Sequence, residues 1–131
     1  MVKVIVDTSF LMLPGTLKID VLRETERLLE RRCEFLVPSP VLDELKKIAE
    51  GGSPREKSAA RLALKIVEKC KVVEAEGEAD SSILSLAEEM KVPVGTADGG
   101  LRRELRKRRV SVIYPRGKSH LAIDGSGEWI K

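Results

Sequence analysis

The sequence predicts an α/β domain with three layers, α/β/α, in which helices cover both faces of a central, mainly parallel sheet. Short apolar runs rich in β-branched residues alternate along the chain with longer segments whose apolar residues recur at helical spacing. The chain has 131 residues, which suits one domain with one core, and it shows no internal repeat. We therefore expect one site, at the carboxyl edge of the sheet, where such folds bind their ligands.

The first elements are expected to be strand, helix and strand. Residues 2–6 are a β-branched run that ends abruptly at Asp7, which is typical of a buried parallel strand. A loop at residues 14–15, proline followed by glycine, precedes an amphipathic helix over residues 18–31. Residues 35–37 then make a brief second strand.

Two helices are expected next. One begins after Pro38 and stops at residues 51–52, because proline is favoured near a helix start and glycine just past a helix end. The following helix begins at Ser53, which has Glu56 at the spacing of a capping box, and it runs toward Cys70.

The last third of the chain repeats the alternation. Residues 72–73, 92–96 and 110–114 are expected strands, and residues 78–90 and 99–109 are the helices between them. We assign residues 1–115 to the domain proper. The polar, glycine-rich residues 116–131 are either an edge hairpin of the same domain or a loosely ordered tail.

Composition excludes several classes of protein. Hydrophobic residues make up 42% of the chain and charged residues 34%, and no apolar stretch approaches the roughly 20 residues that span a bilayer. The N-terminus begins directly with a strand pattern rather than a secretory signal, so we expect a cytoplasmic protein. Cys33 and Cys70 lack the paired spacing of a zinc site, and we interpret them as reduced packing residues.

Two carboxylates follow expected strands. Asp7 ends the first strand and Asp98 follows the strand at residues 92–96, so both fall on the carboxyl edge of the sheet. An alternative is that each caps the helix after it, because aspartate is among the best N-cap residues.

Two further carboxylates share a helical face with apolar residues. Glu44 lies on the stripe of Val41 and Ile48, and Asp80 lies on the stripe of Ile83 and its neighbours. We expect both to point inward, where an unpaired charge is costly and requires a partner. For Asp80 the alternative is a favourable interaction of an acid with the first turn of its helix.

A metal ion is the simpler counter-ion for these four acids, because no cluster of lysine or arginine falls on the same faces. Carboxylate oxygens suit hard cations, so Mg²⁺ or Mn²⁺ is expected rather than zinc. Such ions neutralise a phosphate, activate water and hold a leaving oxygen, which is the chemistry of phosphodiester hydrolysis.

The chain resembles PIN-domain proteins in four segments that occur in the family's order. They are VIVDTSFL at residues 4–11, VLDEL at 41–45, ADSSIL at 79–84 and TADGGLR at 96–102. The resemblance covers roughly residues 1–115, and its last segment looks most like the branch of ribosome-assembly endonucleases. It implies a PIN-like fold and an endoribonuclease dependent on Mg²⁺ or Mn²⁺ that works in RNA processing.

The resemblance also implies roles for single residues. The acidic metal-site and catalytic residues would be Asp7, Glu44, Asp80 and Asp98, and the hydroxyls of Thr8 and Thr96 would assist them. The chain departs from the family at Ala97 and Gly100, where an asparagine and a further acid are common. A second metal would be poorly held there, so a weakly active or inactive RNA-binding or assembly module is the alternative function.

A basic segment follows Asp98. Residues 102–109 hold six basic side chains and one acid, and four of them are assigned as RNA contacts: Arg102, Arg103, Arg106 and Lys107. Arginine and lysine bind phosphates with little dependence on sequence, although a charge run is often only a solvated face. Few aromatics are available for stacking on bases. RNA is the expected partner, a homodimer is considered, and no membrane is involved.

Overall fold

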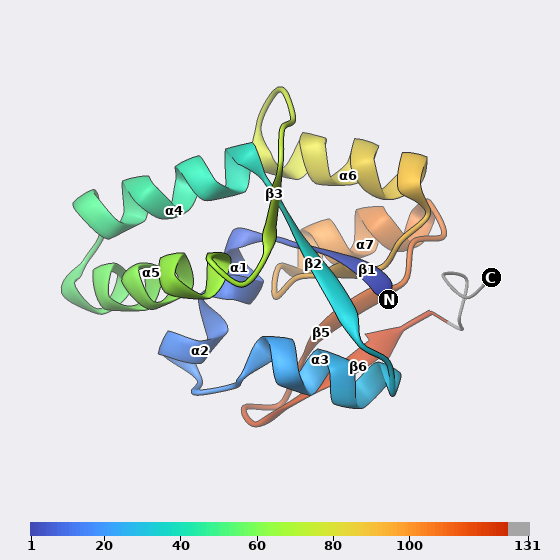
Figure 1. Ribbon diagram of the computed structural model, residues 1–131, viewed down its shortest axis with the longest axis horizontal. Helices are drawn as coiled ribbons and strands as arrows, with labels where there is room; N and C mark the ends of the chain where they lie inside the picture. Colours follow the sequence, from blue (N-terminus) through green and yellow to red (C-terminus); the bar gives the residue numbers. More distant parts are fainter. Residues whose placement is uncertain (126–131) are drawn as a thin grey trace.

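The structure is a computed structural model that describes residues 1–125, and it contains a six-stranded sheet with helices on both sides (Figure 1). The elements in chain order are β1 (Val2–Val6), α1 (Thr8–Leu11), α2 (Leu13–Thr16), α3 (Val21–Leu29), β2 (Cys33–Pro38), α4 (Ser39–Gly51), α5 (Pro54–Val67), β3 (Lys71–Val73), α6 (Ala79–Met90), β4 (Val94–Gly95), α7 (Gly99–Lys107), β5 (Val112–Arg116) and β6 (His120–Asp124). The predicted α/β class and the three-layer arrangement are confirmed.

The order of the strands places β1 in the middle of the sheet. That order is β3-β2-β1-β4-β5-β6, and the first five strands are parallel whereas β6 is antiparallel to β5. From β1 the chain builds outward through β2 and β3, and it then returns to the other side of β1 with β4. The switch in direction lies between β1 and β4, and ligands of open α/β sheets bind outside the carboxyl ends of strands at such a point.

Helices cover both faces of the sheet. Figure 1 shows α6 and α7 on one side and α3 on the other, and α4 lies against α5 beside the sheet.

Helix α5 begins with the predicted capping box, in which the Glu56 N–H donates to Ser53 Oγ at 3.2 Å and the Ser53 N–H donates to Glu56 Oε1 at 2.9 Å. The helix starts predicted at residues 53, 78 and 99 therefore agree with the structure to within one residue.

The core beneath the site is aliphatic, with one aromatic ring at its centre. Val4, Ile5 and Val6 of β1 are fully buried, and so is Phe10 of α1. The ring of Phe10 lies directly over Gly95 of β4, because a Cβ at that glycine would come within 2.7 Å of the ring. The missing side chain lets α1 approach β4, which brings the ends of β1 and β4 together.

The prediction of a loop at residues 14–15 is wrong. Residues 8–16 form the short helices α1 and α2, which the sequence analysis did not predict. Asp7 caps α1, and Pro14 occupies the first turn of α2, where its missing N–H costs nothing. Gly15 allows α2 to pack on α5, because its Cβ would lie 2.6 Å from Ala59 Cα.

Three strands also differ in extent from the prediction by more than one residue. The second strand is longer, since it runs over Cys33–Pro38 rather than residues 35–37. The fourth strand is only Val94–Gly95, and the fifth begins two residues later than expected, at Val112. Val110 instead completes the end of α7, since its N–H donates to the carbonyl of Leu105.

Residues beyond the fifth strand extend the sheet. His120–Asp124 form β6, which pairs with β5 from Arg116–His120 to Val112–Asp124, and Gly117 in the connecting turn has a positive φ of 69°. Residues 126–131, the rest of the predicted tail, lie outside the described residues. The domain boundary that we place after residue 115 stays a prediction. Within residues 1–125, no helix combines the length and the apolar character that crossing a bilayer requires.

Candidate functional site

Four predicted carboxylates line one cavity at the carboxyl edge of the sheet. The cavity has a volume of about 220 Å³, and its lining comes from four separate parts of the chain: Asp7, Thr8, Ser9, Met12, Glu44, Ala79, Asp80 and Asp98. Asp7 follows β1, Glu44 lies on α4, Asp80 is in the first turn of α6 and Asp98 precedes α7. The fold therefore brings together the four acids that the sequence analysis selected.

Asp7 is the buried member of this set. Its side chain is 5% exposed and accepts a hydrogen bond from the Phe10 N–H at 2.8 Å, which caps α1. Ser9 Oγ donates to both carboxylate oxygens of Asp7, at 2.8 and 3.0 Å, and Thr96 Oγ1 donates to Oδ2. These donors fix the orientation of the carboxylate at the floor of the cavity.

Burial raises the pKa of Asp7 from 3.8 to about 6, in spite of the hydrogen bonds from Thr96, Phe10 and Ser9, which lower it. The charge of Asp80 adds a smaller upward shift. The free-energy cost of burying the ionised carboxylate exceeds the stabilisation from its three hydrogen-bond donors. A nearby cation would therefore favour the ionised form of Asp7.

Ser9 is a part of the site that the sequence analysis did not select. Besides its bonds to Asp7, its hydroxyl lies 3.3 Å from Thr96 Oγ1 and accepts a hydrogen bond from the Ala97 N–H at 2.9 Å. It thus joins the loop after β1 to the loop after β4. The only sequence signal for Ser9 was a hydroxyl two residues after the aspartate that ends a strand. Its contact with Thr96, which is 87 positions away in sequence, can be seen only in the folded structure.

Asp98 is both a helix cap and a cavity residue. Its Oδ1 accepts hydrogen bonds from the N–H groups of Gly100 at 2.8 Å and Leu101 at 3.1 Å, which caps α7. The Asp98 N–H donates to Thr96 Oγ1 at 3.0 Å, so Thr96 connects Asp98 to Asp7. Both aspartates therefore cap a helix and also line the cavity, because capping engages only one oxygen of each carboxylate. Their role as site residues stays a prediction.

The prediction that Glu44 and Asp80 point into the core is wrong. Both side chains are exposed, whereas the neighbours of Glu44 at Val41 and Leu45 are fully buried. Each acid lies at the margin of its helix's apolar stripe, where it borders the cavity rather than the hydrophobic interior. The helical spacing of residues shows which of them share one side of a helix. It does not show where along that side the buried core ends and the cavity begins.

The electrostatics of Asp80 show that the acids affect one another. Incomplete solvation raises the pKa of Asp80, and the negative charges of Asp98, Glu44 and Glu78 raise it further. Carboxylates that share a cleft repel one another in this way, and a cation among them relieves the repulsion.

The donors suit a hard divalent cation in their chemistry but are not gathered around one point. All the acids in the cavity offer oxygen ligands, and the Thr8 hydroxyl beside them is buried without a hydrogen-bond partner among the described residues. Within residues 1–125, however, no three carboxylate, imidazole or thiol groups lie close enough to hold one ion as they stand. Three of the four acids, Glu44, Asp80 and Asp98, are exposed, and the first two make no side-chain hydrogen bond or ion pair within residues 1–125 that would hold their rotamers.

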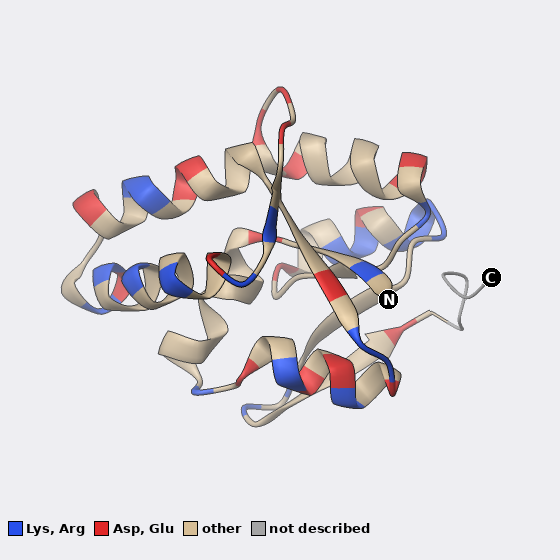
Figure 2. Ribbon diagram, in the orientation of Figure 1, with Lys and Arg blue, Asp and Glu red and all other residues tan. Residues whose placement is uncertain are grey.

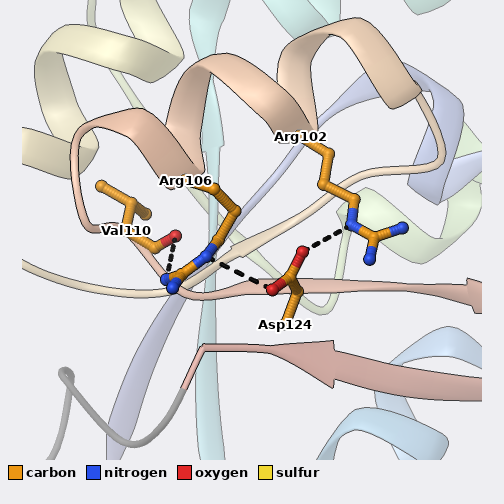
Figure 3. Close-up of polar contacts among 4 residues, drawn as sticks. All are labelled: Arg102, Arg106, Val110 and Asp124. Carbon is orange, nitrogen blue, oxygen red and sulfur yellow. Dashed lines mark hydrogen bonds and ion pairs between the residues drawn. The ribbon is translucent and has the colours of Figure 1, made fainter.

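Two of the predicted RNA contacts are engaged within the fold (Figure 3). The carboxylate of Asp124, on β6, faces α7 and lies 2.9 Å from Arg102 Nε and 3.3 Å from Arg106 Nε. The Arg102 guanidinium also stacks 3.4 Å above the centre of the Tyr114 ring, and Arg106 donates to the carbonyl of Val110 at 3.3 Å. These contacts attach α7 to the hairpin of β5 and β6.

The other two predicted contacts are more available. Lys107 pairs with Glu104 at 3.3 Å on the surface, where such a pair contributes little. Arg103 is exposed and has no ion pair within residues 1–125, and its guanidinium reaches back to Gly99 in the first turn of α7. Among the four, Arg103 is therefore the residue that is without an ion pair within residues 1–125 and lies over the turn that follows Asp98.

Comparisons with known proteins agree on the fold. A family described as "PIN like domain" matches residues 4–118. The chain is 36% identical over 110 residues to ribonuclease VapC9 of Archaeoglobus fulgidus, covering 84% of this chain and 80% of the relative. It is 33% identical over 129 residues to ribonuclease VapC4 of Methanocaldococcus jannaschii, covering 95% of this chain and 98% of the relative.

Solved structures show the same architecture. The PIN domain endonuclease Utp24 superposes with a TM-score of 0.77 at 21% identity, covering 95% of this chain and 92% of that structure. A domain of a protein of unknown function from Methanocaldococcus jannaschii superposes with a TM-score of 0.65 at 18% identity, covering 89% and 93%. At these identities the likeness concerns the fold alone, so the placement nearest the ribosome-assembly endonucleases stays a prediction.

Proposed function

The chain belongs to the PIN-like domain family, and from this premise we propose that it is a divalent-metal-dependent endoribonuclease that hydrolyses RNA phosphodiester bonds. The observation that carries the proposal is the convergence of four carboxylates, from four elements, on one cavity at the switch point of the sheet. The two ribonucleases with which the chain shares a third of its sequence support RNA as the substrate.

Asp7, Glu44, Asp80 and Asp98 would hold Mg²⁺ or Mn²⁺, because oxygen ligands suit both ions. When bound, the ion would supply charge neutralisation at the phosphate and a water of lowered pKa. Within residues 1–125 no three acids are assembled beforehand, so Glu44 and Asp80 would have to turn toward a bound ion. Asp7 and Asp98 are already held by hydrogen bonds, Asp7 through three donors and Asp98 through the N–H groups that it caps.

The protein's own hydroxyls position Asp7 and Asp98. Ser9 and Thr96 donate to Asp7, and Thr96 also accepts the Asp98 N–H, so one hydroxyl sets the relation between the two aspartates. The buried Thr8 hydroxyl, which lacks a protein partner in the described structure, is available to a water or phosphate in the cavity. Preorganised donors of this kind contribute to catalysis because they need no reordering during the reaction.

Arg103 is our proposed phosphate contact beside the acids, with Lys107 further along α7. Arg102 and Arg106 maintain the position of the helix through Asp124. RNA processing in the cytoplasm is the setting that we propose, and a homodimer stays a prediction.

A second candidate function is an inactive RNA-binding or assembly module. It is favoured by the lack of three assembled ligands within residues 1–125 and by Gly100, where the family commonly has a further acid. A side chain at that position would place its Cβ 3.2 Å from Asp98 Oδ1, so the glycine also leaves Asp98 uncrowded.

RNA cleavage by the purified protein separates the two functions. A labelled structured RNA is incubated with protein plus Mg²⁺, Mn²⁺ or EDTA, and the Asp98→Asn protein is the matched control. The nuclease proposal expects internal cuts that need metal and disappear in the variant. RNA binding without any cut, under every metal condition, would favour the inactive module.

A further inference from the structure

A larger hollow continues from the acidic cavity along α4. It has a volume of about 620 Å³ and shares four lining residues with the cavity: Glu44, Ala79, Asp80 and Asp98. Its remaining wall comes from α4 and from the connection before α6. We call this hollow the α4 groove. It is an open surface through which a strand of nucleic acid can reach the acids.

The charge of the α4 groove is strongly negative with one exception. Five of its lining residues are carboxylates, namely Asp43, Glu44, Glu78, Asp80 and Asp98, and among residues 1–125 the only cation in its lining is Lys47. The acids that would hold a divalent ion would have their charge neutralised only near that ion, so phosphates further along the groove would still face carboxylates. An RNA backbone that follows the groove therefore needs a second positive group, and Lys47 is the one that the groove offers.

Lys47 is free to take this role. It is exposed, and it makes no ion pair within residues 1–125 although Asp43 and Glu44 precede it at helical spacing. Along α7 and its C-cap, by contrast, four basic residues pair with carboxylates within residues 1–125 and Arg103 does not: the four are Arg102, Arg106, Lys107 and Arg108. Most basic side chains of α7 are therefore in ion pairs within the described structure, whereas Lys47 is not.

The position of Lys47 fits a neighbouring phosphate rather than the reacting one. It lies three residues after Glu44 on the same helix, which corresponds to about 4.5 Å along the axis. Figure 2 shows this order along α4, with an acidic segment followed by a basic one as the helix runs away from α6. The flexible stem of lysine extends its reach along the groove.

We propose that Lys47 is a substrate-positioning residue whose ammonium binds the RNA phosphate next to the scissile one, so that the RNA strand runs along α4 as it enters the site. This inference rests on the proposed ribonuclease function and adds to it the path of the substrate. Lys47 holds the strand and takes no part in the proton transfers of hydrolysis.

The test compares Lys47→Met with Lys46→Met, a matched control that removes the same charge from the adjacent residue, which does not line the groove. Both proteins, and wild type, are given a short single-stranded RNA and a series of the same RNA in which one phosphate at a time is an uncharged methylphosphonate. Cleavage gives kcat and KM, and fluorescence anisotropy gives the dissociation constant and its dependence on salt.

The expected result is a KM about tenfold higher for Lys47→Met with kcat little changed, since one charge-assisted contact is lost. The slope of log K against log salt becomes shallower by ~0.7, the value for one phosphate contact on single-stranded RNA. Neutralising the phosphate next to the cut weakens RNA binding by wild type and by Lys46→Met, but it does not weaken RNA binding by Lys47→Met any further.

Equal KM values and salt slopes for the two variants would overturn the proposal and leave Lys47 as a solvated surface charge. The binding series is informative even without cleavage. If wild type cuts no RNA, the ribonuclease function fails, whereas the inference about Lys47 is still decided by whether one methylphosphonate position couples to Lys47→Met in the anisotropy measurements.

Discussion

Replacing Asp7 with asparagine preserves the shape of the side chain and removes its charge. The asparagine oxygen can still accept the Phe10 N–H that caps α1, and the Thr96 hydroxyl can reorient toward the new amide. In the absence of metal, the substitution removes a carboxylate that burial disfavours in its ionised form. We therefore expect Asp7→Asn to unfold at a higher temperature than wild type when EDTA is present at neutral pH.

The shifted pKa gives the size of this effect. A rise from 3.8 to about 6 makes the folded protein bind the proton of Asp7 more tightly than the unfolded chain does. Stability therefore falls as pH rises from about 4 to about 6, by a total of about 3 kcal/mol, and stays lower above that range. The amide nitrogen cannot accept a hydrogen bond as the carboxylate oxygen does, which makes the gain smaller than this total. At pH 7 we therefore expect the free energy of unfolding of Asp7→Asn to exceed that of wild type by about 1 to 3 kcal/mol.

Thermal unfolding followed by circular dichroism between pH 4 and 8 measures this difference. A gain of that size corresponds to roughly 4 °C or more in Tm. Asp43→Asn is the control, because Asp43 is an exposed acid on α4 that lies outside the cavity lined by Asp7. If Asp7→Asn is less stable than wild type in EDTA, and the two pH profiles are parallel, then Asp7 is a structural cap rather than a site held under electrostatic strain.

Three further predictions concern the residues around the site. Ser9→Ala removes one hydroxyl that donates to Asp7 and leaves the Ala97 N–H unpaired. The Mn²⁺ affinity measured by calorimetry should therefore fall about tenfold, and a change of less than about twofold would contradict this role of Ser9. Gly95→Ala forces a methyl group against the Phe10 ring and should cost about 1 to 3 kcal/mol in urea unfolding, whereas unchanged stability would contradict the close packing. Ser53→Ala removes the cap of α5 and should lower stability by about 1 kcal/mol while kcat stays unchanged, and a loss of activity would show that α5 influences the site.

The sequence predicted the fold class because its signals were local and repeated. The β-branched run before Asp7, the glycines at the end of α4 and the capping box at Ser53 each specify a strand or a helix boundary through nearby residues. The helices at residues 8–16 were missed because their cause is tertiary, since α2 depends on Gly15 packing against Ala59 of α5. Helices of four residues have too few positions to show a periodic pattern.

The convergence of the four acids on one cavity was predictable, whereas its details were not. Strand ends and helix faces identified the four acids, since parallel strands place their carboxyl ends on one edge of the sheet. The exposure of Glu44 and Asp80 was not predictable, because the border between core and cleft depends on which neighbours pack alongside. The role of Asp124 in engaging Arg102 was equally hidden, since the two residues are 22 positions apart and meet only through β6.

Calorimetric titration of Mn²⁺ into the metal-free protein, with each of the four acids neutralised in turn, shows whether the four acids share one metal site. We expect saturable binding to wild type that is weakened by Asp7→Asn, Glu44→Gln, Asp80→Asn and Asp98→Asn alike, although the four residues belong to different parts of the fold. Binding that is absent in wild type, or that survives all four substitutions unchanged, would contradict a shared metal site.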